Sequence, residues 1–149
     1  MASPNPKSDY AGDVDVTAAW AMLEADSKAQ LIDVRTMAEW NFVGLPDISA
    51  LGRDVHTIEW QSFPSAGPNP EFTAKSAAAL RQAGASADTP LLFICRSGAR
   101  SRAAAIAMTK AGYTRAYNVA GGFEGDIDSD GHRGCANGWK AAGLPWRQN

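Results

Sequence analysis

The sequence has little of what marks several large classes of protein. Its two cysteines in 149 residues are too few for a disulfide framework. No apolar run approaches the length of a membrane span. The net charge is −2, so there is no broad positive field to attract nucleic acid. These absences predict a soluble cytoplasmic protein without nucleic-acid or membrane partners, in a compartment that keeps thiols reduced.

Length and composition predict one folded domain. A chain of 149 residues, 45% of them hydrophobic, is long enough to bury a sizeable core. Residues 1–12 are rich in Ser, Pro, Asn and Asp and contain no apolar segment, so we expect a flexible N-terminal tail. The domain is then expected to span residues 13–149.

Short apolar runs alternate with helix-like segments along the chain, which is typical of an α/β domain with a mostly parallel sheet. Four runs predict strands, at residues 30–34, 55–60, 91–94 and 115–119. Start and stop signals predict helices after Asp15, over 36–42 with Trp40 and Phe42 as apolar anchors, from Asn69 to 83, and over 101–110. The end of the chain, 137–146, is expected to form a short helix and then a hydrophobic strap.

One stretch concentrates the reactive residues. A tight loop from Cys95 to Arg100 joins the buried run 91–94 to the helix that follows. The free N–H groups and positive end of a helix in such a turn point at the loop, and Gly98 lets the backbone curl into an anion-binding nest. A thiol there, beside Arg96 and Arg100, should lose its proton easily. We therefore interpret Cys95 as a nucleophile in an anion site rather than as an inert buried thiol, the more common fate of cysteine.

Two further pairs of residues lie at or just beyond the ends of predicted parallel strands, whose carboxyl ends share one edge of the sheet. Gly121 and Gly122 are expected to form a turn near the reactive loop. Asp33 and Arg35 either approach Cys95 or form a structural ion pair that anchors the next turn, and we favour the ion pair.

Residues at the end of the 55–60 run and just after it are also candidates for the pocket. Trp60 and Phe63 are placed to line its mouth, although core packing is the favoured use of Trp60. His56 lies alone in the same run, and we favour a packed or solvated side chain over a catalytic base.

No metal or cofactor is predicted. Residues 126–131, DIDSDG, match the start of an EF-hand calcium loop, but the twelfth position holds Asn137 instead of the required Glu. His132 and Cys135 supply too few ligands for a metal site. Cys135 could resolve a sulfur intermediate on Cys95 by forming a disulfide, although an ordinary loop cysteine is the favoured interpretation.

Three motifs in this order and spacing resemble the rhodanese (thiosulfate sulfurtransferase) family. CRSGARS at 95–101 is similar to the family's active-site loop, C-x-x-G-x-R/T-S. LIDVR at 31–35, followed by Glu39 and Trp40, resembles its N-terminal signature, and NVAGGF at 118–123 resembles the segment after the active-site helix. The resemblance runs from about Val14 to Trp146. One departure is VGLPDI at 43–48, which lacks the family's usual His and has Asp47 where a glycine is usual.

The resemblance implies a single rhodanese domain, with a five-stranded, mostly parallel sheet and helices on both faces. It also implies that Cys95 takes a sulfane sulfur from a small anionic donor such as thiosulfate, forming a persulfide, and passes it to a thiol, cyanide or a protein acceptor. The substrate-binding residues would be those of the loop: Arg96, Ser97, Gly98, Ala99, Arg100 and Ser101.

Three alternatives stay open at this point. A persulfide carrier that serves a protein partner would need the same Cys95 environment. A Cys-dependent phosphatase or arsenate reductase also holds a cysteine in an anion-binding loop, but tyrosine phosphatases have their Arg one position later, where this chain has Ser101. A non-enzymatic rhodanese-like module is the least favoured, because the cysteine and its loop are complete.

Overall fold

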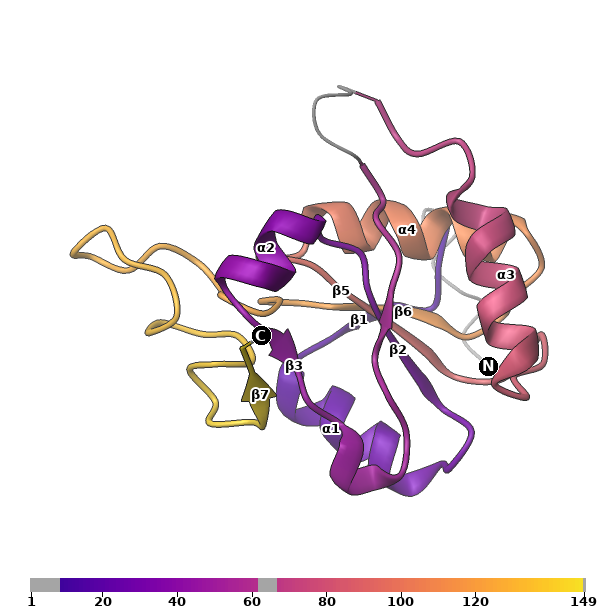
Figure 1. Ribbon diagram of the computed structural model, residues 1–149, viewed down its shortest axis with the longest axis horizontal. Helices are drawn as coiled ribbons and strands as arrows, with labels where there is room; N and C mark the ends of the chain where they lie inside the picture. Colours follow the sequence, from indigo (N-terminus) through magenta and orange to yellow (C-terminus); the bar gives the residue numbers. More distant parts are fainter. Residues whose placement is uncertain (1–8, 62–66, 149) are drawn as a thin grey trace.

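Five short strands form one parallel sheet in the computed structural model, which describes residues 9–61 and 67–148 (Figure 1). The strand order is β1-β6-β5-β2-β4, and every neighbouring pair is parallel. The strands are β1 (Gly12–Val14), β2 (Gln30–Asp33), β4 (His56–Thr57), β5 (Leu91–Ile94) and β6 (Ala116–Val119). The predicted α/β fold is confirmed.

The apolar runs account for most of the sheet. All four residues of β2 and of β5 are buried, as expected for central strands covered on both faces. The predicted strand at 55–60 is shorter than expected. Only His56–Thr57 has strand geometry, although the N–H groups of Ile58 and Trp60 still donate to carbonyls of β2 and its continuation.

The fifth strand, β1, was not predicted. It has three residues and no apolar run, and it includes Gly12, which the sequence had placed in the tail. Its register beside β6 pairs Val14 with Val119, and the N–H of Ala11 donates to the carbonyl of Ala116 at 2.9 Å. Residues 1–8 of the predicted tail lie outside the described residues, as does Phe63.

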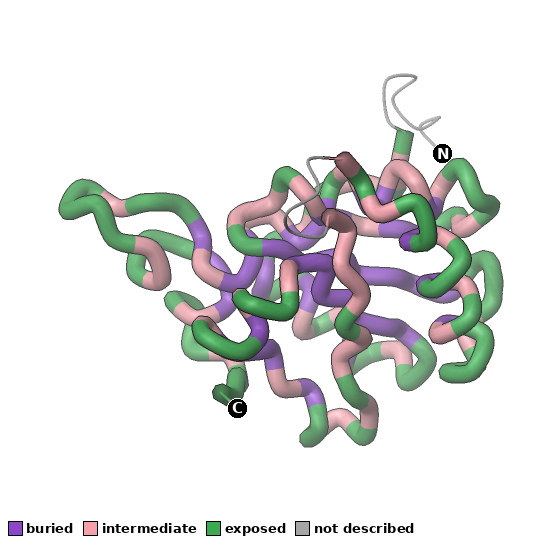
Figure 2. Tube along the Cα trace, turned by 45° about the horizontal axis from the view of Figure 1, so that its top comes forward, coloured by how far each residue is buried: buried purple, intermediate pink, exposed green. Residues whose placement is uncertain are grey.

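Helices cover both faces of the sheet (Figure 1). α1 (Val16–Ala25) packs on one face through Ala19 and Leu23, together with Phe123 and Trp139. α3 (Phe72–Gln82) and α4 (Ala99–Lys110) pack on the other face. Figure 2 shows the buried chain concentrated in the strands between these layers.

Capping residues fix where the helices begin. The Thr36 side chain caps α2 (Met37–Phe42) and exchanges hydrogen bonds with Glu39, which forms a capping box. Trp40 is buried as expected, but Phe42 is 81% exposed, so its prediction as an anchor was wrong. α3 begins at Phe72 rather than next to Asn69. The Asn69 side chain accepts from the N–H of Glu71 in the turn before the helix.

The end of the chain returns to the middle of the sequence. β7 (Trp146–Arg147) pairs antiparallel with β3 (Leu45–Pro46), just before the short 3-10 helix η1 (Ser49–Leu51). The expected closing strap is therefore present, but the expected short helix is not: residues 139–143 form turns.

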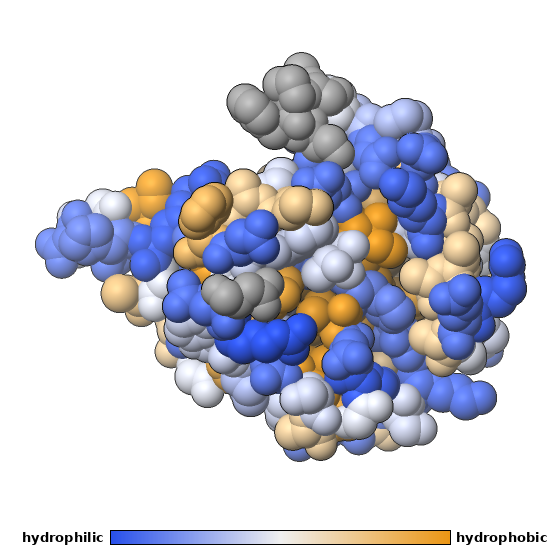
Figure 3. Space-filling model, in the orientation of Figure 1, coloured by the Kyte–Doolittle hydropathy of each residue, from blue (hydrophilic) through white to orange (hydrophobic). Residues whose placement is uncertain are grey.

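The segment between β6 and β7 projects from the body of the domain (Figures 1 and 2). In Figure 3 this projection is mostly hydrophilic, whereas apolar residues gather toward the middle of the same face. Across residues 9–61 and 67–148 there is no helix with the length and apolar character needed to span a membrane.

Candidate active site

Cys95 follows β5, the central strand of the sheet, and it is 1% exposed. Its sulfur nevertheless has polar neighbours. The N–H of Gly98 donates to Sγ at 3.2 Å, and the hydroxyl oxygen of Ser101 lies 3.1 Å from Sγ. The thiol thus sits inside the loop at the N-terminus of α4, where the free N–H groups of the helix gather.

The backbone of the loop turns at Gly98, as the sequence predicts. Gly98 has φ of +128°, a conformation that favours glycine, and it immediately precedes α4. Arg96 is exposed, Ser97 is half-buried and Ala99 is exposed, so these three residues form the outer side of the loop.

The segment after β6 packs against the Cys95 loop, as expected for a turn at Gly121 and Gly122 near that loop. The N–H of Phe123 donates to the carbonyl of Cys95 at 2.8 Å, and the N–H groups of Glu124 and Gly125 donate to the carbonyl of Arg96 at 3.0 Å. Gly122 permits this approach, because a Cβ at that position would lie 2.5 Å from the carbonyl oxygen of Cys95. Any side chain at Gly122 would therefore push the loop away.

Arg100 is bound to a carboxylate, which the sequence did not predict. Its two terminal nitrogens reach the two oxygens of Glu39 at 2.6 and 3.0 Å. Burial acts to raise the pKa of Glu39, but hydrogen bonds and charge from Arg100 outweigh it and hold that pKa below its ordinary value. The hydrogen bond to Glu39 in turn raises the pKa of Arg100. The guanidinium is thereby fixed in position beside the loop, with part of its charge neutralised.

The lowered pKa of Glu39 predicts a pH-dependent contribution to stability. A carboxyl whose pKa falls on folding stabilises the native state above its unfolded pKa, and it loses that effect as the pH falls through its folded pKa. We expect Glu39→Gln to lower the free energy of unfolding by about 1 kcal/mol at pH 7, with the difference from wild type shrinking below about pH 4. Urea unfolding across this pH range measures both quantities. Glu24→Gln, at an exposed position on α1, is the control, and a constant difference for Glu39→Gln down to pH 3 would contradict this origin.

Asp33 and Arg35 form the structural ion pair that the sequence favoured. Both side chains are fully buried, with a shortest N–O distance of 2.6 Å. Arg35 also donates to the carbonyl of Gly44 at 2.6 Å, and its guanidinium stacks over the ring of Phe123 at 4.3 Å. The pair thus joins β2 to the start of β3 and to the segment that supports the Cys95 loop.

Ser101 and Asn118 link the thiol to β6 and β1. The Ser101 hydroxyl lies 2.6 Å from Oδ1 of Asn118, and Nδ2 of Asn118 lies 3.0 Å from Oδ1 of Asp13. Ser101 is fully buried and Asn118 is 5% exposed. Ser101 was predicted to lie in the loop, but no role was predicted for Asn118 or Glu39, although both belong to the motifs that resemble the rhodanese family.

Trp60 and His56 have other contacts. The Trp60 ring packs edge-on against Phe72 of α3, with ring centroids 5.0 Å apart, so core packing, the favoured use, is confirmed. His56 lies 2.9 Å from the side-chain oxygen of Gln30, at the start of β2, and burial lowers its pKa. The His56 ring thus has a structural hydrogen-bond partner, and no role in the chemistry of Cys95 is needed to explain its position.

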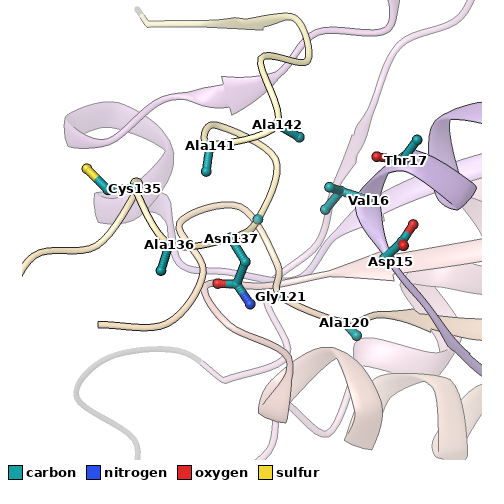
Figure 4. Close-up of a pocket in the computed structure, with 11 residues that line it drawn as sticks. Asp15, Val16, Thr17, Ala120, Gly121, Cys135, Ala136, Asn137, Ala141 and Ala142 are labelled. Atoms are coloured by element: carbon teal, nitrogen blue, oxygen red, sulfur yellow. The ribbon is translucent and has the colours of Figure 1, made fainter. Parts of the chain in front are cut away.

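Cys135 lies on the projecting segment, at the rim of a pocket next to the active-site turn. The pocket is lined by residues of the α1 start, by Ala120 and Gly121, and by residues 135–138 and 141–142 (Figure 4). In this view the Cys135 sulfur points away from Gly121 and Asn137. The structure thus places an exposed second thiol near the site without joining it to Cys95.

The DIDSDG stretch is a turn held by its own carboxylates. Oδ1 of Asp128 accepts from the N–H groups of Asp130 and His132, both at 2.9 Å, and Asn137 closes the base of the loop against Asp126. Within the part of the chain that the structure describes, no three His, Cys, Asp or Glu side chains converge on a point where a metal ion would fit.

The chain as a whole matches a known protein family. The family model described as "STR4 middle domain" matches residues 11–149. The chain belongs to the STR4 middle domain family. It is 34% identical to RP600 of Rickettsia prowazekii, a protein described as uncharacterized, over 88% of this chain and 93% of that one. A related Rickettsia conorii protein, RC0915, also described as uncharacterized, is 33% identical over the same shares of the two chains.

Two solved structures share the fold. The crystal structure of Rv0390 from M. tuberculosis is 48% identical, with a TM-score of 0.80 over 94% of this chain and 99% of that one. The solution structure of a polysulfide-sulfur transferase homodimer from Wolinella succinogenes is 22% identical, with a TM-score of 0.58 over 95% of this chain and 80% of that one. The chain thus has the rhodanese-like α/β fold, with a five-stranded parallel sheet, that the motifs predicted.

Proposed function

We propose that this protein is a sulfurtransferase that carries a sulfane sulfur on Cys95. The observation that carries the proposal is the setting of the Cys95 sulfur, held 3.2 Å from the N–H of Gly98 inside the loop that begins α4. N–H groups at such a position stabilise a thiolate, the nucleophilic form, and would also stabilise the terminal sulfur of a persulfide. The fold shared with a polysulfide-sulfur transferase is compatible with this chemistry.

The reaction has two half-steps. The Cys95 thiolate attacks the outer sulfur of thiosulfate or a similar donor. A sulfur–sulfur bond forms to Cys95 while the donor's own bond breaks, and the electron pair leaves with sulfite. An acceptor thiol or cyanide then attacks the terminal sulfur of the persulfide, which regenerates the Cys95 thiolate. This is covalent catalysis with ping-pong kinetics and needs no separate cofactor.

The loop residues have different roles in binding an anionic donor. Arg96 is exposed beside Cys95 and is suited to meet the donor's oxygens. Arg100 was expected to share this role, but its bidentate contact with Glu39 directs it mainly to holding the loop against α2. The N–H groups from Arg96 to Ser101 complete the anion site.

The same contact argues against a phosphatase. That chemistry uses the loop arginine to clamp the phosphate oxygens, whereas Arg100 is occupied by Glu39 and precedes the usual position by one residue. A loop of four residues between Cys95 and Arg100 also encloses less space, which suits a sulfur atom better than a tetrahedral phosphate.

Intact mass spectrometry tests the proposal directly. The protein is incubated with thiosulfate without reductant, and its mass is measured before and after cyanide is added. We expect a gain of one sulfur atom on the Cys95 peptide, its removal by cyanide, and no gain in Cys95→Ser. Cys135→Ser is the matched control and should gain sulfur like the wild type. An adduct that persists in Cys95→Ser, or none with thiosulfate, mercaptopyruvate or polysulfide, would overturn the assignment.

A further inference from the structure

A chain of hydrogen bonds leads from Cys95, after the central strand, to β1 at the edge of the sheet. It passes from Sγ to the Ser101 hydroxyl, then through the Asn118 amide to Asp13, and ends at Tyr10. Each link is between 2.6 and 3.1 Å long. The chain joins α4, β6 and β1, so it crosses three elements that the fold brings together.

The chemistry of these groups fixes the direction of the hydrogen bonds. A carboxylate only accepts hydrogen bonds, so Nδ2 of Asn118 must be the donor to Asp13. Oδ1 of Asn118 therefore faces Ser101 and can only accept. Tyr10 donates to the same carboxylate oxygen at 2.8 Å, which further fixes Asp13.

The single proton of the Ser101 hydroxyl cannot serve two acceptors. While that proton is directed at Asn118, the hydroxyl oxygen can only accept from the Cys95 thiol. When Cys95 is a thiolate, the hydroxyl can instead rotate and donate to the sulfur, but it must then give up Asn118. Asn118 cannot follow, because Asp13 holds its other end.

We propose that Asn118 is a positioning residue that competes with the Cys95 sulfur for the Ser101 proton and so sets the balance between thiol and thiolate. The N–H of Gly98 stabilises the thiolate whichever way the Ser101 hydroxyl points. Asn118 draws the Ser101 proton away from the sulfur, so it opposes this second stabilising hydrogen bond. The inference rests on the proposed role of Cys95 as the nucleophile, and it assigns to β6 and β1 a part in tuning that role.

The charged groups around the thiol are the same in every variant used to test this. They are Arg100 of α4 with its partner Glu39 of α2, the buried Asp33 at the end of β2 with Arg35 just after it, Asp13 of β1 behind Asn118, and Arg96 and Glu124 on the loops. None of them contacts the hydroxyl of Ser101 directly among the described residues, so a change at Ser101 isolates its hydrogen bonds. A change at Asn118 also removes the hydrogen bond to Asp13, and comparing the double variant with Ser101→Ala measures that effect.

The test is the rate at which iodoacetamide alkylates Cys95, followed by intact mass in a Cys135→Ser background. At pH 7, Ser101→Ala should slow alkylation by about two- to tenfold, the effect of one hydrogen bond, because the thiolate loses its donor. Asn118→Leu, of similar size, should accelerate it by a comparable factor, because the Ser101 proton is released to the sulfur. The double variant should match Ser101→Ala.

Two comparisons separate this effect from a loosened loop. The alkylation rate should rise with pH to a plateau at which the thiolate is fully formed, and the variants should converge on that plateau, whereas a difference in access would persist there. A loosened loop would also accelerate the double variant. Asn118→Ala repeats the test if leucine prevents folding. Equal rates at pH 7, or acceleration that survives in the double variant, would overturn the proposal. Alkylation needs no sulfur donor, so this result is independent of whether the protein transfers sulfur.

Discussion

Gly122→Ala is expected to abolish sulfur loading of Cys95 and to lower the free energy of unfolding by about 3–4 kcal/mol. The residue has φ of +63°, which already disfavours a side chain. The added methyl would also lie 2.5 Å from the carbonyl oxygen of Cys95 and 2.6 Å from two backbone atoms of Arg96. Backbone atoms cannot move aside as a flexible side chain can, so the reactive loop must shift.

Gly84→Ala is the matched control for this prediction. Gly84 has φ of +84°, and a Cβ there would meet nothing within 4 Å. Gly84→Ala should therefore lower the free energy of unfolding by only about 1 kcal/mol, the cost of a side chain in the left-handed conformation, and leave sulfur loading intact. Urea unfolding measures the two stabilities, and mass spectrometry after thiosulfate treatment measures loading. If both variants lose stability equally and load sulfur equally, the close approach of Gly122 to the loop is not what positions Cys95.

Arg35→Met is expected to lower the free energy of unfolding by about 3–5 kcal/mol. The substitution leaves the Asp33 carboxylate fully buried without its cation, 2.6 Å from where the guanidinium was. It also removes the donor to the carbonyl of Gly44 and the cation over Phe123. The loss should be measured by urea unfolding at pH 7.

The double variant Asp33→Leu with Arg35→Met separates the unpaired charge from the lost packing. Removing both partners of a buried ion pair costs less than removing one, because no charge is left behind. The double variant should therefore be more stable than Arg35→Met alone. If it is less stable, the cost of Arg35→Met comes from its contacts with Gly44 and Phe123 and not from the stranded carboxylate.

The sequence predicted the central part of the fold because that part is encoded locally. All four residues of β5 are apolar and buried. β2 is apolar and buried in its middle, with Gln30 and Asp33 as its two polar ends. By contrast, β1 has no local signal. Its three residues form a strand because they pair with the edge of β6. That pairing depends on tertiary structure and not on local sequence.

The same distinction holds for the candidate site. The loop from Cys95 to Ser101 could be assigned because its residues are adjacent in sequence. The partner of Arg100 could not, because Glu39 lies 61 residues away. Asn118 was equally hidden, since an Asn in a strand has no pattern that tells whether it is solvated or serves a buried hydroxyl.

The bond between Asn118 and Asp13 has a consequence for how the domain folds. It spans 105 residues, so the surroundings of Cys95 are completed only when β1 docks beside β6. Parallel strands this far apart close a large loop before their contacts stabilise them, and such topologies fold slowly. On the ribosome, the N-terminal strand must therefore wait for β6 to emerge, and until then the nascent chain carries Cys95 without its finished hydrogen-bond network.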